Sequence, residues 1–92
     1  MIVRILGEGQ WDVDDALLDA LNVLDAAVER AVESGDEEAF RTGMTGLLDG
    51  VRRQGTRLED DSLLESDLIL PPADASIDEV RALMSDEGLV PD

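Results

Sequence analysis

The stretch from Asp14 to Gly55, DDALLDALNVLDAAVERAVESGDEEAFRTGMTGLLDGVRRQG, decides the fold. Its apolar residues recur every three or four positions, which predicts two amphipathic helices at about 15–34 and 37–54. The predicted apolar seams are Leu17, Leu21, Leu24, Val28 and Ala31 in the first helix and Phe40, Met44, Leu47 and Val51 in the second. Because the connection Ser34-Gly35-Asp36 is short, we expect the two helices to pack antiparallel.

The ends of both predicted helices carry recognisable signals. We expect Gly35 and Gly55 to adopt left-handed backbone conformations just past the helices, and Asp36 to cap the start of the second one. The first helix also has a broad apolar arc, which predicts contact with more than one neighbour. The residues that widen this arc on one flank are Ala16, Ala20, Val23 and Ala27.

Small residues form a narrow stripe along the second predicted helix. Each glycine inside a helix costs about 1 kcal/mol relative to alanine, so the stripe needs a compensating role. One interpretation is that it lets another backbone approach closely, which makes it a candidate contact for a partner; the alternative is that these are tolerated surface glycines. The residues of the stripe are Ala39, Gly43, Gly46 and Gly50.

Residues 1–13 are predicted to form a β-hairpin. The β-branched run of residues 2–6 leads into Gly7-Glu8-Gly9, a three-residue glycine turn, and Trp11 and Val13 then share one face of the second strand. An isolated hairpin is marginal in water, so we expect a third strand, either Leu68-Ile69-Leu70 or a hairpin from a second copy. Trp11 is interpreted as an anchor of the hairpin on the helices, with an exposed partner contact as the alternative.

Residues 56–75 are predicted to be an acidic loop that ends in Pro71-Pro72. Its carboxylates do not have the spacing of a calcium-binding loop, so a solvated loop is the favoured interpretation. Three of them are candidate partner contacts, namely Asp60, Asp61 and Glu65.

The last segment, residues 76–92, is predicted to be a short helix and a tail. Ser76 and Glu79 have the spacing of a capping box, and Gly88 suits the end of the helix, before Leu89-Val90-Pro91. The apolar stripe predicted to be buried is Ile77, Val80, Leu83 and Met84. The predicted fold is therefore mainly α in a single small domain: an N-terminal hairpin, a long antiparallel helical hairpin and a short C-terminal helix.

Composition limits the classes of function. The 92 residues include 23 acids, 7 arginines and no cysteine, and the formal net charge is −16. Such a chain is repelled by phosphate backbones and anionic lipids, so we expect no nucleic-acid or direct membrane binding and favour a basic protein partner. The alternative is that the acidity only confers solubility. With no apolar run of membrane-spanning length and no signal peptide, a cytoplasmic location is expected.

Catalysis is not expected. The sequence contains no histidine, cysteine, lysine or tyrosine, so acid–base and nucleophilic roles would fall to carboxylates and hydroxyls that capping and solvation already explain. Adjacent acids such as Asp14-Asp15 arise in so acidic a chain without binding a metal. We therefore predict no enzyme activity, no cofactor and no metal site.

Three segments resemble the PspA-associated protein family, PspAA, of actinobacteria and archaea. They are MIVRILGEGQW at 1–11, the helical sequence at 13–41, and SDLILPPADASIDEVRALMSDEGLVP at 66–91. The resemblance implies a small trihelical protein encoded beside phage-shock protein A, a coiled-coil membrane-remodelling protein of the envelope-stress response. It implies no catalytic residues. Residues 42–46 depart from the family pattern, in which a helix richer in alanine and leucine is expected.

The residues and the resemblance lead to the same hypothesis, an adaptor that docks its acidic surface or its small-residue groove on phage-shock protein A. Charge complementarity and helix packing would supply the contact. A second hypothesis is a structural homo-oligomer with a four-helix core, most simply a homodimer, although repulsion between copies opposes it. A third is an acidic mimic of nucleic acid.

Overall fold

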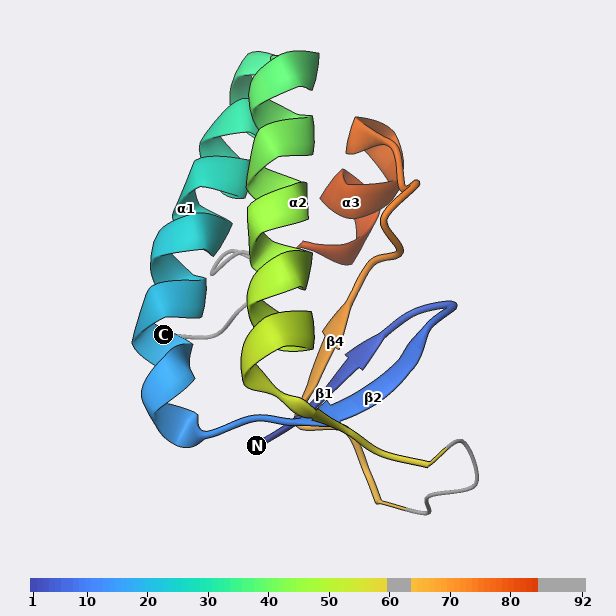
Figure 1. The fold of residues 1–92 in the computed structure, drawn as a ribbon. Coiled ribbons are helices and arrows are strands. Elements are labelled where there is room, and N and C mark those ends of the chain that lie inside the picture. The colour runs from blue at the N-terminus through green and yellow to red at the C-terminus, as the bar shows by residue number, and fades with distance from the viewer. Residues whose placement is uncertain (60–63, 85–92) are drawn as a thin grey trace.

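The computed structural model describes residues 1–59 and 64–84. Figure 1 shows two long helices side by side, a small sheet at the end where the first helix starts and the second stops, and a short third helix. In chain order the elements are β1 (Ile2–Ile5), β2 (Gly9–Asp12), the 3-10 helix η1 (Asp15–Leu17), α1 (Leu18–Ser34), α2 (Glu37–Gln54), β3 (Thr56–Arg57), β4 (Leu68–Leu70) and α3 (Ile77–Leu83). The predicted features at Asp60, Asp61, Gly88 and residues 89–91 lie outside the described residues.

The helical hairpin is confirmed. Helix α2 occupies the predicted range, and the predicted first helix is divided into η1 and α1. At the turn between α1 and α2, Gly35 has a φ of 72° and donates its N–H to the carbonyl of Ala31, as expected of a left-handed cap. Asp36 Oδ1 then accepts the N–H of Ala39 at 3.1 Å and caps α2. Each local signal at this turn therefore has a counterpart in the structure.

The prediction for Gly55 is wrong. Its backbone is extended, with φ of −91° and ψ of 163°, so a left-handed conformation does not explain the glycine. The explanation is space, because a Cβ at this position would lie 2.7 Å from the carbonyl oxygen of Val51 and 3.0 Å from side-chain atoms of Trp11 and Val13. The chain turns from α2 into β3 at a point where the hairpin leaves no room for a side chain.

The small-residue stripe of α2 packs against α1 of the same chain. A Cβ on Gly43 would lie 2.9 Å from Cγ2 of Val28, so Gly43 has the least room of the three glycines in this stripe. Gly46 and Gly50 have more room, since the nearest atoms to an added Cβ, on Leu24 and Leu21, would be 3.5 and 3.7 Å away. The stripe is therefore an intramolecular helix contact, and the interpretation of close backbone approach applies most strongly to Gly43.

Alanine substitutions along this stripe are expected to separate the two interpretations. Gly50→Ala should raise the free energy of unfolding by about 0.5–1 kcal/mol, since it removes the helical cost of glycine without a clash. Gly43→Ala has the same helical gain, but a Cβ there meets the stiff side chain of Val28, so we expect it to be less stable than Gly50→Ala by about 1–3 kcal/mol. Urea unfolding followed by circular dichroism measures both. Equal stabilisation by the two substitutions would show that the helices separate freely.

The hairpin is part of a four-stranded sheet with the order β3-β2-β1-β4. Strands β1 and β2 are antiparallel, with Val3 opposite Trp11, and β4 lies parallel to β1 with Val3 opposite Leu68. The third strand therefore comes from residues 68–70 of the same chain. Strand β3, inside the predicted loop, was not expected; it pairs with β2 and places Arg57 opposite Trp11. The predicted loop of residues 56–75 is thus shorter than expected at its start, where β3 occupies Thr56–Arg57.

One face of the sheet contributes to the core. Val3, Ile5 and Leu70 are fully buried, and Trp11 is 5% exposed. The core continues through both long helices into α3, and its helical members are Leu21, Val28, Ala31, Val32, Phe40, Met44, Leu47, Leu48, Val51, Ile77 and Val80. A single continuous core thus unites the sheet and the three helices.

The widened apolar arc of η1 and α1 is only partly used within the chain. Ala16 and Ala20 are exposed, Ala27 is half-buried, and Val23 has 71% of its surface exposed. The prediction of more than one neighbour is nevertheless confirmed, because α1 contacts both α2 and α3, and Arg81 of α3 donates to the carbonyl of Val32 in α1. The flank itself stays largely uncovered among the described residues.

The C-terminal helix begins at the predicted capping box. Ser76 Oγ accepts the N–H of Glu79 at 3.2 Å, and the Glu79 carboxylate accepts the N–H of Ser76 at 3.3 Å. Ile77 and Val80 are buried as predicted, but Leu83 is 51% exposed and Met84 is half-buried. The burial predicted for Leu83 is therefore wrong, because α3 ends at this residue and its buried side chains, Ile77 and Val80, lie in its first turn.

Candidate protein-binding site

The predicted contact residues do not form one surface. Trp11 lies in the core, with the guanidinium carbon of Arg57 5.4 Å from its ring centroid. Gly43, Gly46 and Gly50 face α1, while Ala39 is exposed near the start of α2. Glu65 is exposed on the segment that leads to β4. Of this set, Ala39 and Glu65 are the described residues most accessible to a partner.

The segment before β4 is held against the outer face of the sheet. The side-chain amide of Gln10 donates to the carbonyl of Leu64 at 3.0 Å and to Oγ of Ser66 at 2.8 Å. Arg4 Nε also donates to Oγ of Ser66, at 3.3 Å. These bonds satisfy Gln10, a buried polar residue, and fix the backbone on which Glu65 lies.

A shallow groove lies over the tip of the helical hairpin and has a volume of about 680 Å³. It includes Ala39 and Gly43 from the predicted stripe. Its rim is polar and carries both signs of charge, from Arg30, Asp36 and Glu38. Charges of both signs suit a solvated surface as well as they suit a partner, so this groove has little chemical selectivity.

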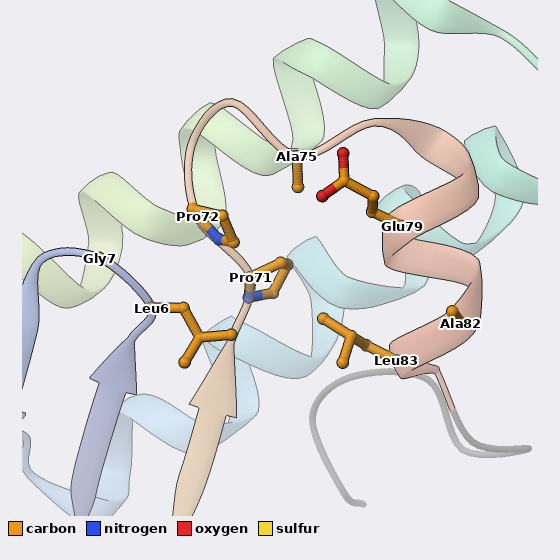
Figure 2. A pocket seen from close by; sticks show the side chains of 8 residues that line it. All are labelled: Leu6, Gly7, Pro71, Pro72, Ala75, Glu79, Ala82 and Leu83. Carbon is orange, nitrogen blue, oxygen red and sulfur yellow. The ribbon is translucent and has the colours of Figure 1, made fainter.

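A more apolar cleft, which we call the proline cleft, lies between the turn of the hairpin and α3. Its volume is about 460 Å³. Figure 2 shows Leu6 and Leu83 on either side of Pro71, with Glu79 above them. The lining residues are Leu6, Gly7, Pro71, Pro72, Ala75, Glu79, Ala82 and Leu83. They come from three separate parts of the chain, so only the folded protein forms this cleft.

The proline cleft was not predicted from the sequence, although its residues carried a signal. Leu6 follows the buried Ile5 directly, so the alternation of the strand places this apolar side chain away from the core. Leu6 and Leu83 are 37% and 51% exposed, and two large exposed side chains beside a pair of prolines make a larger apolar surface than either makes alone.

The charges beside the proline cleft differ in their pairing. Glu8, next to Gly7, forms a bidentate ion pair with Arg52, whose other nitrogen donates to Asp49 at 3.0 Å. Hydrogen bonding by Arg52 lowers the pKa of the Glu8 carboxyl from its ordinary value, while burial opposes this shift. Glu79 instead caps its own helix, and Arg81 turns away to Asp78 and to the carbonyl of Val32. Glu79 is therefore the anionic group that the cleft presents.

Residues 1–59 and 64–84 contain no group of three or more histidine, cysteine, aspartate or glutamate side chains placed to hold a metal ion. Within the same residues, none of the helices has the length and apolar character needed to cross a bilayer.

The fold is that of a small mixed α/β domain. Its groove and its proline cleft leave apolar surface open beside carboxylates. A family model described as PspA-Associated protein, PspAA, matches residues 1–92. The chain belongs to this family. No curated protein and no solved structure matches it with significance.

Proposed function

We propose that the protein is a non-enzymatic accessory protein that binds phage-shock protein A and regulates it in the envelope-stress response. The observation that carries the proposal is the match of the PspA-associated family model to the whole chain. A net charge of −16 and open apolar surface beside carboxylates support binding to a basic partner. In this proposal the protein is cytoplasmic and reaches the membrane only through its partner.

Co-purification tests the proposal. Phage-shock protein A tagged in the native cell should retain the protein at low salt, and the purified pair should bind more weakly, on the order of tenfold, when ionic strength rises from about 0.1 to about 1 M, because salt screens the exposed carboxylates. The same salt series on a neutral ligand of the tag measures the effect of salt alone. Absence of binding at all ionic strengths would contradict the proposal.

A second candidate is a homo-oligomer, favoured by the uncovered flank of α1, on which Val23 is 71% exposed. Repulsion between copies that each carry a net charge of −16 opposes it and weakens as salt is added. Light scattering at several ionic strengths measures the mass of the protein in solution and tests this candidate. A monomeric mass at both low and high salt would remove the candidate.

A further inference from the structure

We propose that the proline cleft is the docking site for a leucine-sized side chain on an amphipathic helix of the partner, with arginine or lysine within about one helical turn of it. This inference rests on the proposed function, since it names the surface used by the partner proposed there. It differs from the expectation from sequence, which placed the contact on Trp11, the small-residue stripe and the acidic loop.

The proline cleft is held in shape before a partner arrives. The backbone N–H of Leu6 donates to the carbonyl of Leu70 at 3.0 Å, which fixes one wall at the end of β4. The rings of Pro71 and Pro72 restrict the backbone of the floor. Arg81 donates to the carbonyl of Val32 at 3.0 Å, and with the capping box this bond holds α3, the other wall. A preformed site adds affinity because little chain order is lost on binding.

The chemistry of the lining favours a protein side chain over a small ligand. Small-molecule sites combine apolar walls with several polar groups that orient the ligand. The side chains that line the proline cleft offer one such group, the carboxylate of Glu79, and it already accepts the N–H of Ser76. The cleft otherwise offers apolar contact with Leu6 and Leu83, and such contact is sufficient to bind an apolar side chain of a helix.

Charge selects the kind of helix. Glu79 stands at the cleft, and Arg81, the nearest cation along α3, is engaged with Asp78 at 3.2 Å. A cationic residue next to the apolar anchor therefore meets an anionic wall in a protein whose net charge is −16. A second copy of the chain brings the same negative charge and is disfavoured as the occupant. The groove at the tip of the helical hairpin lacks this selectivity because Arg30 and Glu38 both line it.

Uncharged substitutions in the full chain test the site. Leu83→Gln and Leu6→Gln should each weaken binding to purified phage-shock protein A at least about tenfold, as expected for truncating an anchor of an interface. Val23→Gln is the matched control, because Val23 is also an exposed apolar helical residue but lies on α1. It should bind within about twofold of the wild type. Circular dichroism and the melting temperature establish that each variant is folded.

A further variant tests the role of the negative charge at the proline cleft. Glu79→Gln keeps an acceptor for the capping box and removes the negative charge, so we expect it to weaken binding a few-fold at low salt and to have no effect near 1 M salt.

The outcomes distinguish the site from the function. If both cleft variants bind like the wild type, the inference is overturned and the proposed function stands, whether or not Val23→Gln loses binding. If the wild type itself does not bind, the proposed function fails and the inference fails with it. A cleft variant that instead changes the mass of the free protein would make a second copy the occupant. A small molecule that native mass spectrometry finds on the wild type and not on Leu83→Gln would make the site a ligand pocket. Both of these results also overturn the inference.

Discussion

Replacing Phe40 with alanine is expected to lower the free energy of unfolding by about 3–5 kcal/mol. Phe40 is 2% exposed, and the N-cap at Asp36 fixes its place in the first turn of α2. Its ring cannot be replaced by a neighbouring aromatic residue, because Trp11 is the other aromatic side chain in the sequence and lies in the sheet. A domain of this size is stable by roughly 5–14 kcal/mol, so the loss takes a large share of its stability.

The measurement is urea unfolding at 25 °C, with the melting temperature as a second readout. Phe40→Leu should lose less than Phe40→Ala because it leaves a smaller cavity, and Val23→Ala, on the exposed flank of α1, should stay within about 0.5 kcal/mol of the wild type. A loss below about 1 kcal/mol for Phe40→Ala would show that the ends of the helices collapse onto the empty space, or that Phe40 is not part of the core.

The helical hairpin was predictable because its signals are local. Asp36 caps α2 by accepting the N–H of the third residue after it, and Gly35 ends α1. The bounds of α2, Glu37 and Gln54, could therefore be predicted from the sequence alone. The capping box at Ser76 and Glu79 is local in the same way. Such signals depend on neighbours three or four positions away, so the rest of the fold does not need to be known.

The sheet depends on distant residues and was only partly predictable. The pairing of Val3 with Leu68 joins positions far apart in sequence, and the choice between this strand and a second copy could not be made from pattern. Strand β3 has two residues, too few for an alternation to appear, and is held through Arg57, which donates to the carbonyl of Glu8 at 2.6 Å. Short strands of this kind follow from tertiary contacts and carry no periodic signal.

The proline cleft was missed for a related reason. Its walls, at Leu6 and Leu83, belong to a turn and to the last residue of a helix, and each was assigned from its own element. Periodicity placed Leu83 in a buried stripe, but periodicity does not indicate where the neighbouring element stops. A surface formed by the ends of several elements becomes visible when their spatial arrangement is known.

Asparagine is expected to cost much less stability in place of Gly35 than in place of Gly55, although the two glycines look alike in sequence. Gly35 has a φ of 72° and open space around it, and asparagine tolerates this backbone, so Gly35→Asn should cost no more than about 1 kcal/mol. Gly55 has an ordinary extended backbone but no room for a Cβ, so Gly55→Asn should cost about 3 kcal/mol, in the range of severe overpacking.

Alanine variants at both glycines complete the test, because they separate backbone strain from lack of space. At Gly35, alanine should be worse than asparagine, since alanine does not favour the left-handed region. At Gly55, alanine should be destabilising and asparagine no better, since both add the Cβ that meets the carbonyl oxygen of Val51. The four variants are compared by urea unfolding. If Gly55→Asn were as stable as Gly35→Asn, the chain would have to leave α2 by a left-handed turn, and the close contact of this corner with Trp11 and Val13 would be absent.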